Sequence, residues 1–286
     1  MKLGMNLFLW TGHVGSEHLA LFSELAEAGF DLLELPRAGY KSIEIKQINR
    51  ELDDLGLSRS VATILDEYSN PISPDPRVRQ AALEKLRADI ELTAELGGEA
   101  LIGPIHSAHK LFCGRGPSED EFSWCAETLR AAGEYAASFN IELSVEFLNR
   151  FECYFLNTCQ QTSELVRAIA LNNVGILYDT HHAHIEEREQ GSAILANASS
   201  INQIHISESH RGTPGTGTVD WISVFKAIKA SAYDGRVVIE AFGTRDPDIA
   251  SAVNIWRDCF ESEESVYQDG LHLIKQGLQD CQKNAR

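Results

Sequence analysis

The chain has 286 residues, of which 43% are hydrophobic, and its formal net charge is −17 at pH 7. This length and composition suit one large domain with a substantial core, so we expect residues 1–286 to fold as a single unit. The negative charge repels phosphate backbones and anionic bilayers, which argues against nucleic acid or a membrane as a partner.

The first segment, MKLGMNLFLWTGHVG, is apolar over too few residues for a signal peptide or a spanning helix. Further along, the six cysteines form no CxxC pair, and a chain of this length does not need disulfides for its stability. We therefore expect free thiols and a cytoplasmic protein.

Short apolar or β-branched segments alternate with longer amphipathic segments, which is typical of a parallel sheet covered by helices. Between the third and fourth strands, a predicted helix opens with Ser73 and Pro74 and closes on Gly97 and Gly98. A terminal helix is expected from about residue 248. The predicted strands are residues 2–9, 30–35, 58–64, 99–104, 141–147, 173–179, 201–206 and 236–241.

Eight strands paired with eight helices at this length indicate the α/β class and a closed (β/α)8 barrel, the TIM-barrel fold. The first predicted strand is not followed by a GxGxxG motif, which argues against an open, doubly wound sheet.

Four of the predicted strands end in residues that can bind a metal, namely Glu146, Asp179, His205 and Glu240. In a barrel, the carboxyl ends of the strands converge on one mouth. Three carboxylates gathered there would repel one another, and burial would raise their pKa values, unless a cation held them together. Three oxygens and one imidazole suit Mn²⁺, Mg²⁺ or Co²⁺, and Zn²⁺ is a further candidate.

Other polar residues follow the same strand ends and fit a pocket for a ligand with hydroxyls and a carbonyl. Two of these residues, Arg150 and His184, could instead hydrogen-bond to the metal ligands and orient them without contacting the sugar. The full set is Asn149, Arg150, Glu152, His182, His184 and Arg211.

Five segments of the chain resemble the D-tagatose 3-epimerase and D-psicose 3-epimerase group of the sugar isomerase/epimerase superfamily, whose members have a xylose isomerase-like TIM barrel. The resemblance extends to about Asp258 and implies a homodimer or homotetramer. The segments are VEFLNRFE, YDTHHAHIEE, HISESHRGTPGTG, DGRVVIEAF and NIWRD.

The resemblance also implies a role for each residue of the site. Glu146 and Glu240 would be the catalytic pair and would ligate the metal together with Asp179 and His205. The substrate would be bound near its O1 and O2 by Glu152, His182 and Arg211.

Two departures from this family concern the substrate. His184 stands where these epimerases usually have Asn, and the loop GPIHSAHKLFCGRG lacks their tryptophan-containing stretch. That loop helps to line the sugar pocket of the family. Here it carries His106, Ser107 and His109, which leaves the identity of the sugar open.

We therefore expect a divalent-metal-dependent ketose 3-epimerase that acts on a small keto sugar. One glutamate would remove the C3 proton, giving a metal-bound cis-enediolate, and the other would return a proton to the opposite face. Strands five and eight are three places apart in an eight-strand ring, so Glu146 and Glu240 should approach the intermediate from different sides.

Three alternatives remain at this stage. An aldose-ketose isomerase, including a hydroxypyruvate isomerase, would use the same intermediate and return the proton to C1 or C2. A nuclease of the endonuclease IV type would need a basic rim and more metal ligands than this acidic chain offers. A non-catalytic sugar-binding barrel would need neither of the two candidate bases that are present.

Overall fold

Eight parallel strands form a closed barrel in the order of the sequence, and β8 pairs with β1 to close the ring. The computed structural model describes residues 1–283, and the side chains of residues 1–280. The barrel and the eight strands predicted from the sequence are confirmed, except that the first strand ends at Asn6 and Leu7–Leu9 form a short 3-10 helix. The strands are β1 (Lys2–Asn6), β2 (Leu32–Pro36), β3 (Ser58–Ala62), β4 (Ala100–Gly103), β5 (Glu142–Glu146), β6 (Val174–Asp179), β7 (Ile201–Ile206) and β8 (Arg236–Ile239).

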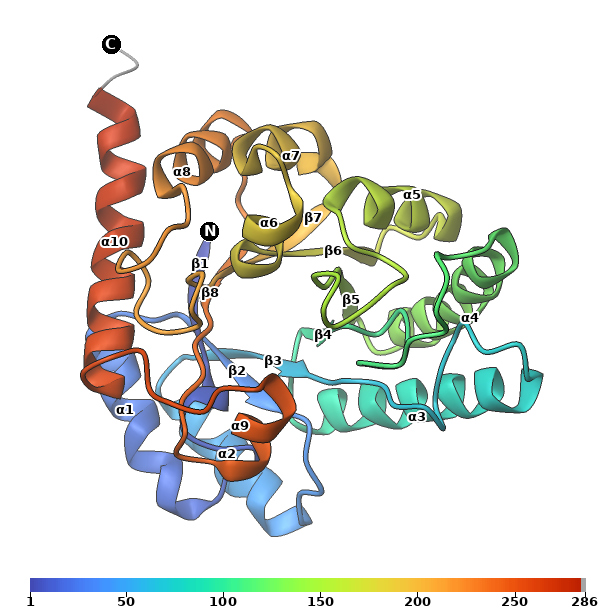
Figure 1. The fold of residues 1–286 in the computed structure, drawn as a ribbon. Coiled ribbons are helices and arrows are strands. Elements are labelled where there is room, and N and C mark those ends of the chain that lie inside the picture. Colours follow the sequence, from blue (N-terminus) through green and yellow to red (C-terminus); the bar gives the residue numbers. More distant parts are fainter. Residues whose placement is uncertain (284–286) are drawn as a thin grey trace.

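The helices surround the strands, as Figure 1 shows. None of those in the described part of the chain has an apolar stretch long enough to cross a bilayer. They are α1 (Leu19–Ala28), α2 (Ser42–Asp54), α3 (Pro76–Glu95), α4 (Glu119–Ala137), α5 (Cys159–Ile169), α6 (Thr180–Glu186), α7 (Gln190–Asn197), α8 (Trp221–Ala230), α9 (Pro247–Val253) and α10 (Glu263–Lys283).

The helix predicted after the third strand begins slightly later than its sequence suggested. Asp75 is the N-cap of α3 and accepts a hydrogen bond from the backbone N–H of Arg77, while Pro76 takes the first helical position. Proline is well suited there because its missing N–H would have no partner inside the helix. Ser73 instead accepts a hydrogen bond from the backbone of Asp75.

The terminal segment forms two helices where the sequence predicted one from about residue 248. Asn254 adopts a left-handed conformation with φ of 58° and ends α9, and α10 begins only at Glu263. Asparagine tolerates this conformation better than most residues, which explains why the helix stops there.

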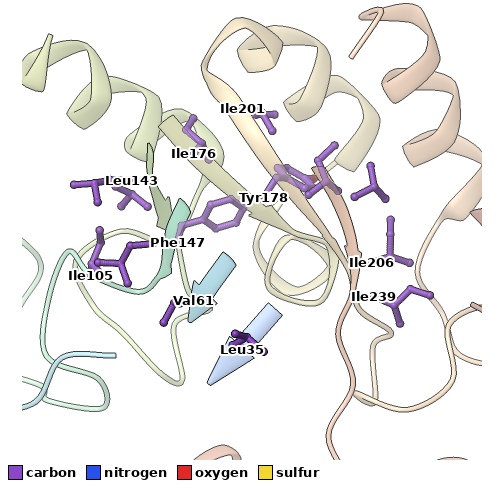
Figure 2. Close-up of a cluster of buried hydrophobic side chains, with 14 of the residues drawn as sticks. Leu35, Val61, Ile105, Leu143, Phe147, Ile176, Tyr178, Ile201, Ile206 and Ile239 are labelled. Atoms are coloured by element: carbon purple, nitrogen blue, oxygen red, sulfur yellow. The ribbon is translucent and has the colours of Figure 1, made fainter. Parts of the chain in front are cut away.

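The main hydrophobic core lies between the strands and the surrounding helices. Phe147 and Tyr178 pack edge to face in it, with ring centroids 5.6 Å apart, and Figure 2 shows the two side chains pointing toward each other. A smaller cluster of Ala62, Ala100, Ile102 and Leu177 is separate from this core. Since side chains alternate along a strand, the two clusters occupy opposite faces of the sheet.

The cysteines whose side chains are described are all free, as expected from the sequence. Three of them, Cys125, Cys153 and Cys159, are buried, where they act as small apolar side chains. The sixth, Cys281, lies outside the described side chains.

Candidate active site at the mouth of the barrel

The four predicted metal ligands meet at one point. Glu146, Asp179, His205 and Glu240 are all buried, and one ligand atom from each lies within 4.8 Å of those of the others. Divalent ions take oxygen ligands at about 2.0–2.6 Å, so two ligands of one ion lie at most about 4–5 Å apart. The four side chains are therefore close enough together to share one ion.

The barrel brings these side chains together through the register of its strands. Asp179 is paired with His205 across β6 and β7, and the backbone of Glu240, just after β8, donates to the carbonyl of Ile206. Glu146 and Asp179 are the last residues of β5 and β6. Neighbouring parallel strands that end at one rim therefore place their final inward side chains side by side.

Electrostatic strain among the carboxylates favours a bound cation. Burial raises the pKa of Glu146 well above its usual value, and the negative charges of Glu240 and Asp179 add to this effect. Burial also raises the pKa of Glu240. A divalent cation would offset this repulsion, and it would favour the ionised form of each carboxylate.

One nitrogen of His205 is free to bind that cation. Its Nδ1 atom is buried, has no hydrogen-bond partner among the described residues, and lies 3.3 Å from Glu240 and 3.7 Å from Asp179. Its Nε2 atom lies 3.0 Å from the fully buried Glu34. An unpartnered ring nitrogen that faces two carboxylates is the arrangement expected of a metal ligand, so the residues present fit a divalent ion.

Arg211 lies beside the four residues and carries the nearest positive charge. Its Nη1 atom donates to Asp179 at 2.9 Å and to Glu240 at 2.7 Å, and its Nη2 atom lies 2.9 Å from His182. Burial opposes the ionisation of Asp179, but the charge of Arg211 lowers the pKa of this carboxyl well below its usual value. The guanidinium of Arg211 thus contacts two of the four predicted metal ligands, Asp179 and Glu240.

His182 and Glu152 complete the polar wall next to Arg211. His182 accepts a hydrogen bond at Nδ1 from the backbone N–H of Asn149, and burial lowers its pKa to about 4, so the ring is neutral at pH 7. Glu152 lies 3.0 Å from His109 and accepts from the Asn149 amide. Burial opposes the charge on Glu152, but these contacts lower its pKa below the usual value.

A cavity of about 520 Å³ opens over these residues, which is within the range of about 300–1,000 Å³ for small-molecule pockets. Its apolar wall includes Phe8 and Phe242, whose rings stack 6.2 Å apart. Val253 of α9 borders it from above the strand ends. From the predicted site, the cavity is lined by Glu146, Glu152, His182, Arg211 and Glu240.

Several other candidates from the sequence lie outside this cavity in the described part of the chain. The exposed Arg150 forms an ion pair with Glu186, with 2.7 Å between nitrogen and oxygen. His184 lies 3.2 Å from the Thr218 hydroxyl. In the loop after β4, His106 is buried and only His109 reaches the cavity.

Glu34 is a residue of this site that the sequence reasoning missed. It accepts hydrogen bonds from Asn6 at 2.6 Å, Gln203 at 2.6 Å and Ser60 at 3.1 Å. Since β2 and β7 are not neighbours in the ring, its contacts with Gln203 and His205 cross the barrel interior. The signal was present in the segment LLELP, where one acid interrupts a run of apolar residues.

Comparisons with known proteins agree with the barrel fold. A family model described as Xylose isomerase-like TIM barrel matches residues 22–276. A ketose 3-epimerase of Arthrobacter globiformis is 35% identical over 281 residues, which are 97% of this chain and 97% of that protein. A solved structure of L-ribulose 3-epimerase has a TM-score of 0.93 at 29% identity and covers 99% of this chain and 96% of its own. The D-psicose 3-epimerase from Clostridium cellulolyticum H10, solved with D-tagatose, has a TM-score of 0.88 at 26% identity, covering 97% and 99%.

Proposed function

Because the chain belongs to the xylose isomerase-like TIM barrel family, we propose that it is a divalent-metal-dependent ketose 3-epimerase acting on a small keto sugar. Its relatives named as ketose 3-epimerase, L-ribulose 3-epimerase and D-psicose 3-epimerase support an enzyme of the isomerase class. The observation that carries the proposal is the meeting of Glu146 and Glu240 with Asp179 and His205, because the two glutamates also line one cavity.

In the proposed reaction, Glu146 and Glu240 act as the two proton-transfer groups. One carboxylate removes the proton from C3 of the ketose, which leaves a planar cis-enediolate, and the other carboxyl returns a proton to the opposite face. A bound divalent ion would polarise the C2 carbonyl and stabilise the negative charge that develops on its oxygen. Glu146 is the last residue of β5, and Glu240 comes directly after β8. The two groups therefore come from strands that are not neighbours in the ring.

The neighbouring polar groups hold the sugar for this exchange. Arg211 and His182 offer hydrogen-bonding groups next to the two glutamates, and Glu152 accepts from a hydroxyl. We assign these three residues to the C1 and C2 end of the sugar. The rings of Phe8 and Phe242 limit water at the reacting carbons, which strengthens the electrostatic interactions there.

Proton NMR in D₂O tests this proposal directly. The Mn²⁺- or Mg²⁺-loaded protein is incubated with D-fructose, D-psicose, D-tagatose or L-ribulose in separate tubes, and deuterium is followed at each carbon. We expect deuterium at C3 together with the C3 epimer. Deuterium confined to C1 would identify an aldose-ketose isomerase instead, and no exchange in any tube would contradict epimerisation of these four neutral ketoses.

The metal that we propose is Mn²⁺, Mg²⁺ or Co²⁺, with Zn²⁺ as a weaker candidate. The support is the donor set, which offers three carboxylates and a single imidazole. Oxygen-rich sets favour Mg²⁺ and Mn²⁺ over softer ions. Activity of the metal-stripped protein after adding each ion separately would rank the four.

We also propose that the protein is a cytoplasmic homodimer or homotetramer. Free cysteines, two of them fully buried, fit a reducing compartment. Large apolar side chains stay exposed on segments that follow the carboxyl ends of the strands, including Phe112, Phe151 and Trp256. Exposed apolar groups at one end of a barrel suit contacts between subunits, and light scattering after size-exclusion chromatography would give the molar mass.

A further inference from the structure

The cavity above the proposed metal site extends to the opposite side of the barrel mouth. Arg37, just after β2, Thr63, just after β3, and Lys85 of α3 all line it. In an eight-strand ring, β2 and β3 lie opposite β6 and β7, which carry Asp179 and His205. A ligand held at the metal end therefore extends across the mouth toward Arg37 and Lys85.

Two cations share one buried carboxylate at this far end. Arg37 donates from Nε to Oδ1 of Asp89 at 2.6 Å, and Lys85 donates to Oδ2 at 2.9 Å. The hydroxyl of Thr63 also donates to Oδ2, at 2.7 Å. Asp89 is completely buried, whereas the side chains of Arg37 and Lys85 are 37% and 25% exposed. Two positive charges against one negative charge leave a surplus of one positive charge facing the cavity.

Both cations keep hydrogen-bond donors for a ligand. Among the residues that the structure describes, the two terminal nitrogens of Arg37 make no hydrogen bond, since its recorded bond uses Nε. The Lys85 ammonium has three N–H donors, and its partners are Asp89 and, at 3.4 Å, Thr63. A guanidinium fork and an ammonium side by side match the oxygens of a carboxylate or phosphate.

One acidic residue, Asp66, lines the same part of the cavity, but it is hydrogen-bonded to its own loop. Its Oδ1 accepts from the backbone N–H of Tyr68 at 3.0 Å and from the Ser69 hydroxyl at 2.8 Å. It forms no ion pair with Arg37 or Lys85 in the described chain. Asp66 is also exposed, so water screens its charge far more than the charge of a buried group.

From this arrangement we propose that Arg37 and Lys85 bind an anionic group, a phosphate or a carboxylate, at the end of the ketose remote from C1. The inference rests on the proposed epimerase function and narrows its substrate class to acidic keto sugars. Asp89 is a positioning residue, because it is completely buried and holds the two cations at the cavity wall without lining the cavity itself.

The test compares kcat/KM for C3 exchange on D-fructose, D-fructose 6-phosphate and the ketouronate D-fructuronate. We expect one or both acidic sugars to exceed D-fructose by about tenfold or more, because hydrogen bonds to charged groups are the stronger kind. Preference for the phosphate or for the uronate distinguishes the two anions. A kcat/KM for D-fructose that equals or exceeds both acidic values would overturn the inference.

Single variants then separate ligand binding from a purely structural ion pair. Arg37→Gln and Lys85→Gln each leave Asp89 one cation, and each should lower kcat/KM for the preferred acidic sugar about tenfold while changing D-fructose less than about threefold. Arg37→Lys, which keeps the charge, should show a smaller loss. The matched control Arg50→Gln removes an arginine that is 85% exposed on α2 and should change neither value. Equal losses on acidic and neutral sugars would assign the pair to structure alone.

A binding measurement keeps this test independent of the epimerase reaction. Isothermal titration of the Mn²⁺-loaded wild type with D-fructose 6-phosphate should give binding that weakens in Arg37→Gln and not in Arg50→Gln. If D-fructose exchanges at C3 but neither acidic sugar binds, the anion inference fails and the epimerase proposal stands. If no sugar exchanges at C3 but the phosphate ester binds through Arg37, the epimerase proposal fails and the anion site stands.

Discussion

The two ring nitrogens of His205 have different surroundings, and this difference depends on Glu34. Nε2 lies 3.0 Å from the Glu34 carboxylate, while Nδ1 faces Asp179 and Glu240 and makes no hydrogen bond within the part of the chain that the structure describes. A carboxylate behind an imidazole fixes the ring and its tautomer, which makes the opposite nitrogen a better metal ligand. Glu34 is in turn held by Gln203 and Asn6, so its own position is fixed.

We therefore expect Glu34→Gln to weaken Mn²⁺ binding by about 10- to 100-fold, because a neutral amide cannot supply the negative charge behind His205. Isothermal titration of the metal-stripped protein measures this change. Glu84→Gln is the control, since Glu84 is exposed on α3 and bonds only to Gln80 in the described chain. Wild-type Mn²⁺ affinity in a folded Glu34→Gln protein would show that Glu34 has no such role.

The proton-transfer scheme gives a second prediction at this scale. Glu146→Gln and Glu240→Gln should each lower the rate of C3 exchange by about 10²- to 10⁴-fold, because an amide cannot accept the proton. The rates are measured at saturating Mn²⁺, with bound metal determined on the same samples, and sugar binding should persist. Glu84→Gln again serves as the control. Rates near that of the wild type in both variants would exclude the two-glutamate scheme.

At the scale of single elements, α4 shows how one acid fixes a helix end. Ser118 and Glu121 form a reciprocal capping box, and Glu121 also receives hydrogen bonds from Arg115 at 2.8 Å and Tyr154 at 2.7 Å. Burial alone would raise the pKa of Glu121, but these bonds lower it to about 2. The ionised carboxylate therefore ties the loop after β4 and the loop after β5 to the same helix end.

Glu121→Gln keeps a residue that can form the capping box but removes the negative charge facing Arg115, so it should cost about 1–2 kcal/mol of unfolding free energy at pH 7. A depressed pKa stabilises the fold at pH values above the unfolded value near 4.5 and loses its effect as the pH falls toward about 2. The difference from the wild type should therefore shrink over that window in urea titrations at several pH values. Glu119→Gln, exposed in the same turn, is the control. A difference that does not depend on pH would contradict this account.

Sequence patterns predicted the elements better than the contacts between them. The eight strands and the helix between the third and fourth of them follow from local chemistry, because apolar runs and helix caps act over a few residues. The four ligand positions follow from one added rule, that strand ends converge in a barrel. The functions of these residues stay predictions until they are tested.

Long-range partners could not be predicted in the same way. Glu34 binds groups 169 and 26 residues away, and Arg37 meets Asp89 52 residues along the chain. The residues around Glu34 and Arg37 do not identify these partners, because many other polar or charged side chains of the chain could form the same hydrogen bonds or ion pairs. The polar interior of the barrel and the cationic side of its mouth therefore emerge only when the ring has closed.

At the scale of the whole molecule, the buried carboxylates at the mouth of the barrel connect the site to the stability of the fold. The chain has a net charge of −17, and three of its carboxylates are buried together at the mouth of the barrel. These groups come from β5, β6 and the end of β8, with His205 from β7 among them. A cation bound there would link four consecutive strands, half of the ring, and would relieve their mutual repulsion.

Metal loading should consequently raise the thermal stability of the entire barrel. A ligand at a concentration of about 100 times its Kd stabilises the folded state by about 2.7 kcal/mol, which for a chain of this size corresponds to about 5–8 °C in Tm. Scanning calorimetry of the EDTA-treated protein, with and without Mn²⁺, measures the shift. In Asp179→Asn the shift should largely disappear, whereas the exposed-site variant Glu84→Gln should retain it in full. Identical Tm values for stripped and loaded wild-type protein would show that the four residues hold no ion, and the repulsion between Glu146 and Glu240 would then have to be relieved by Arg211 and by proton uptake.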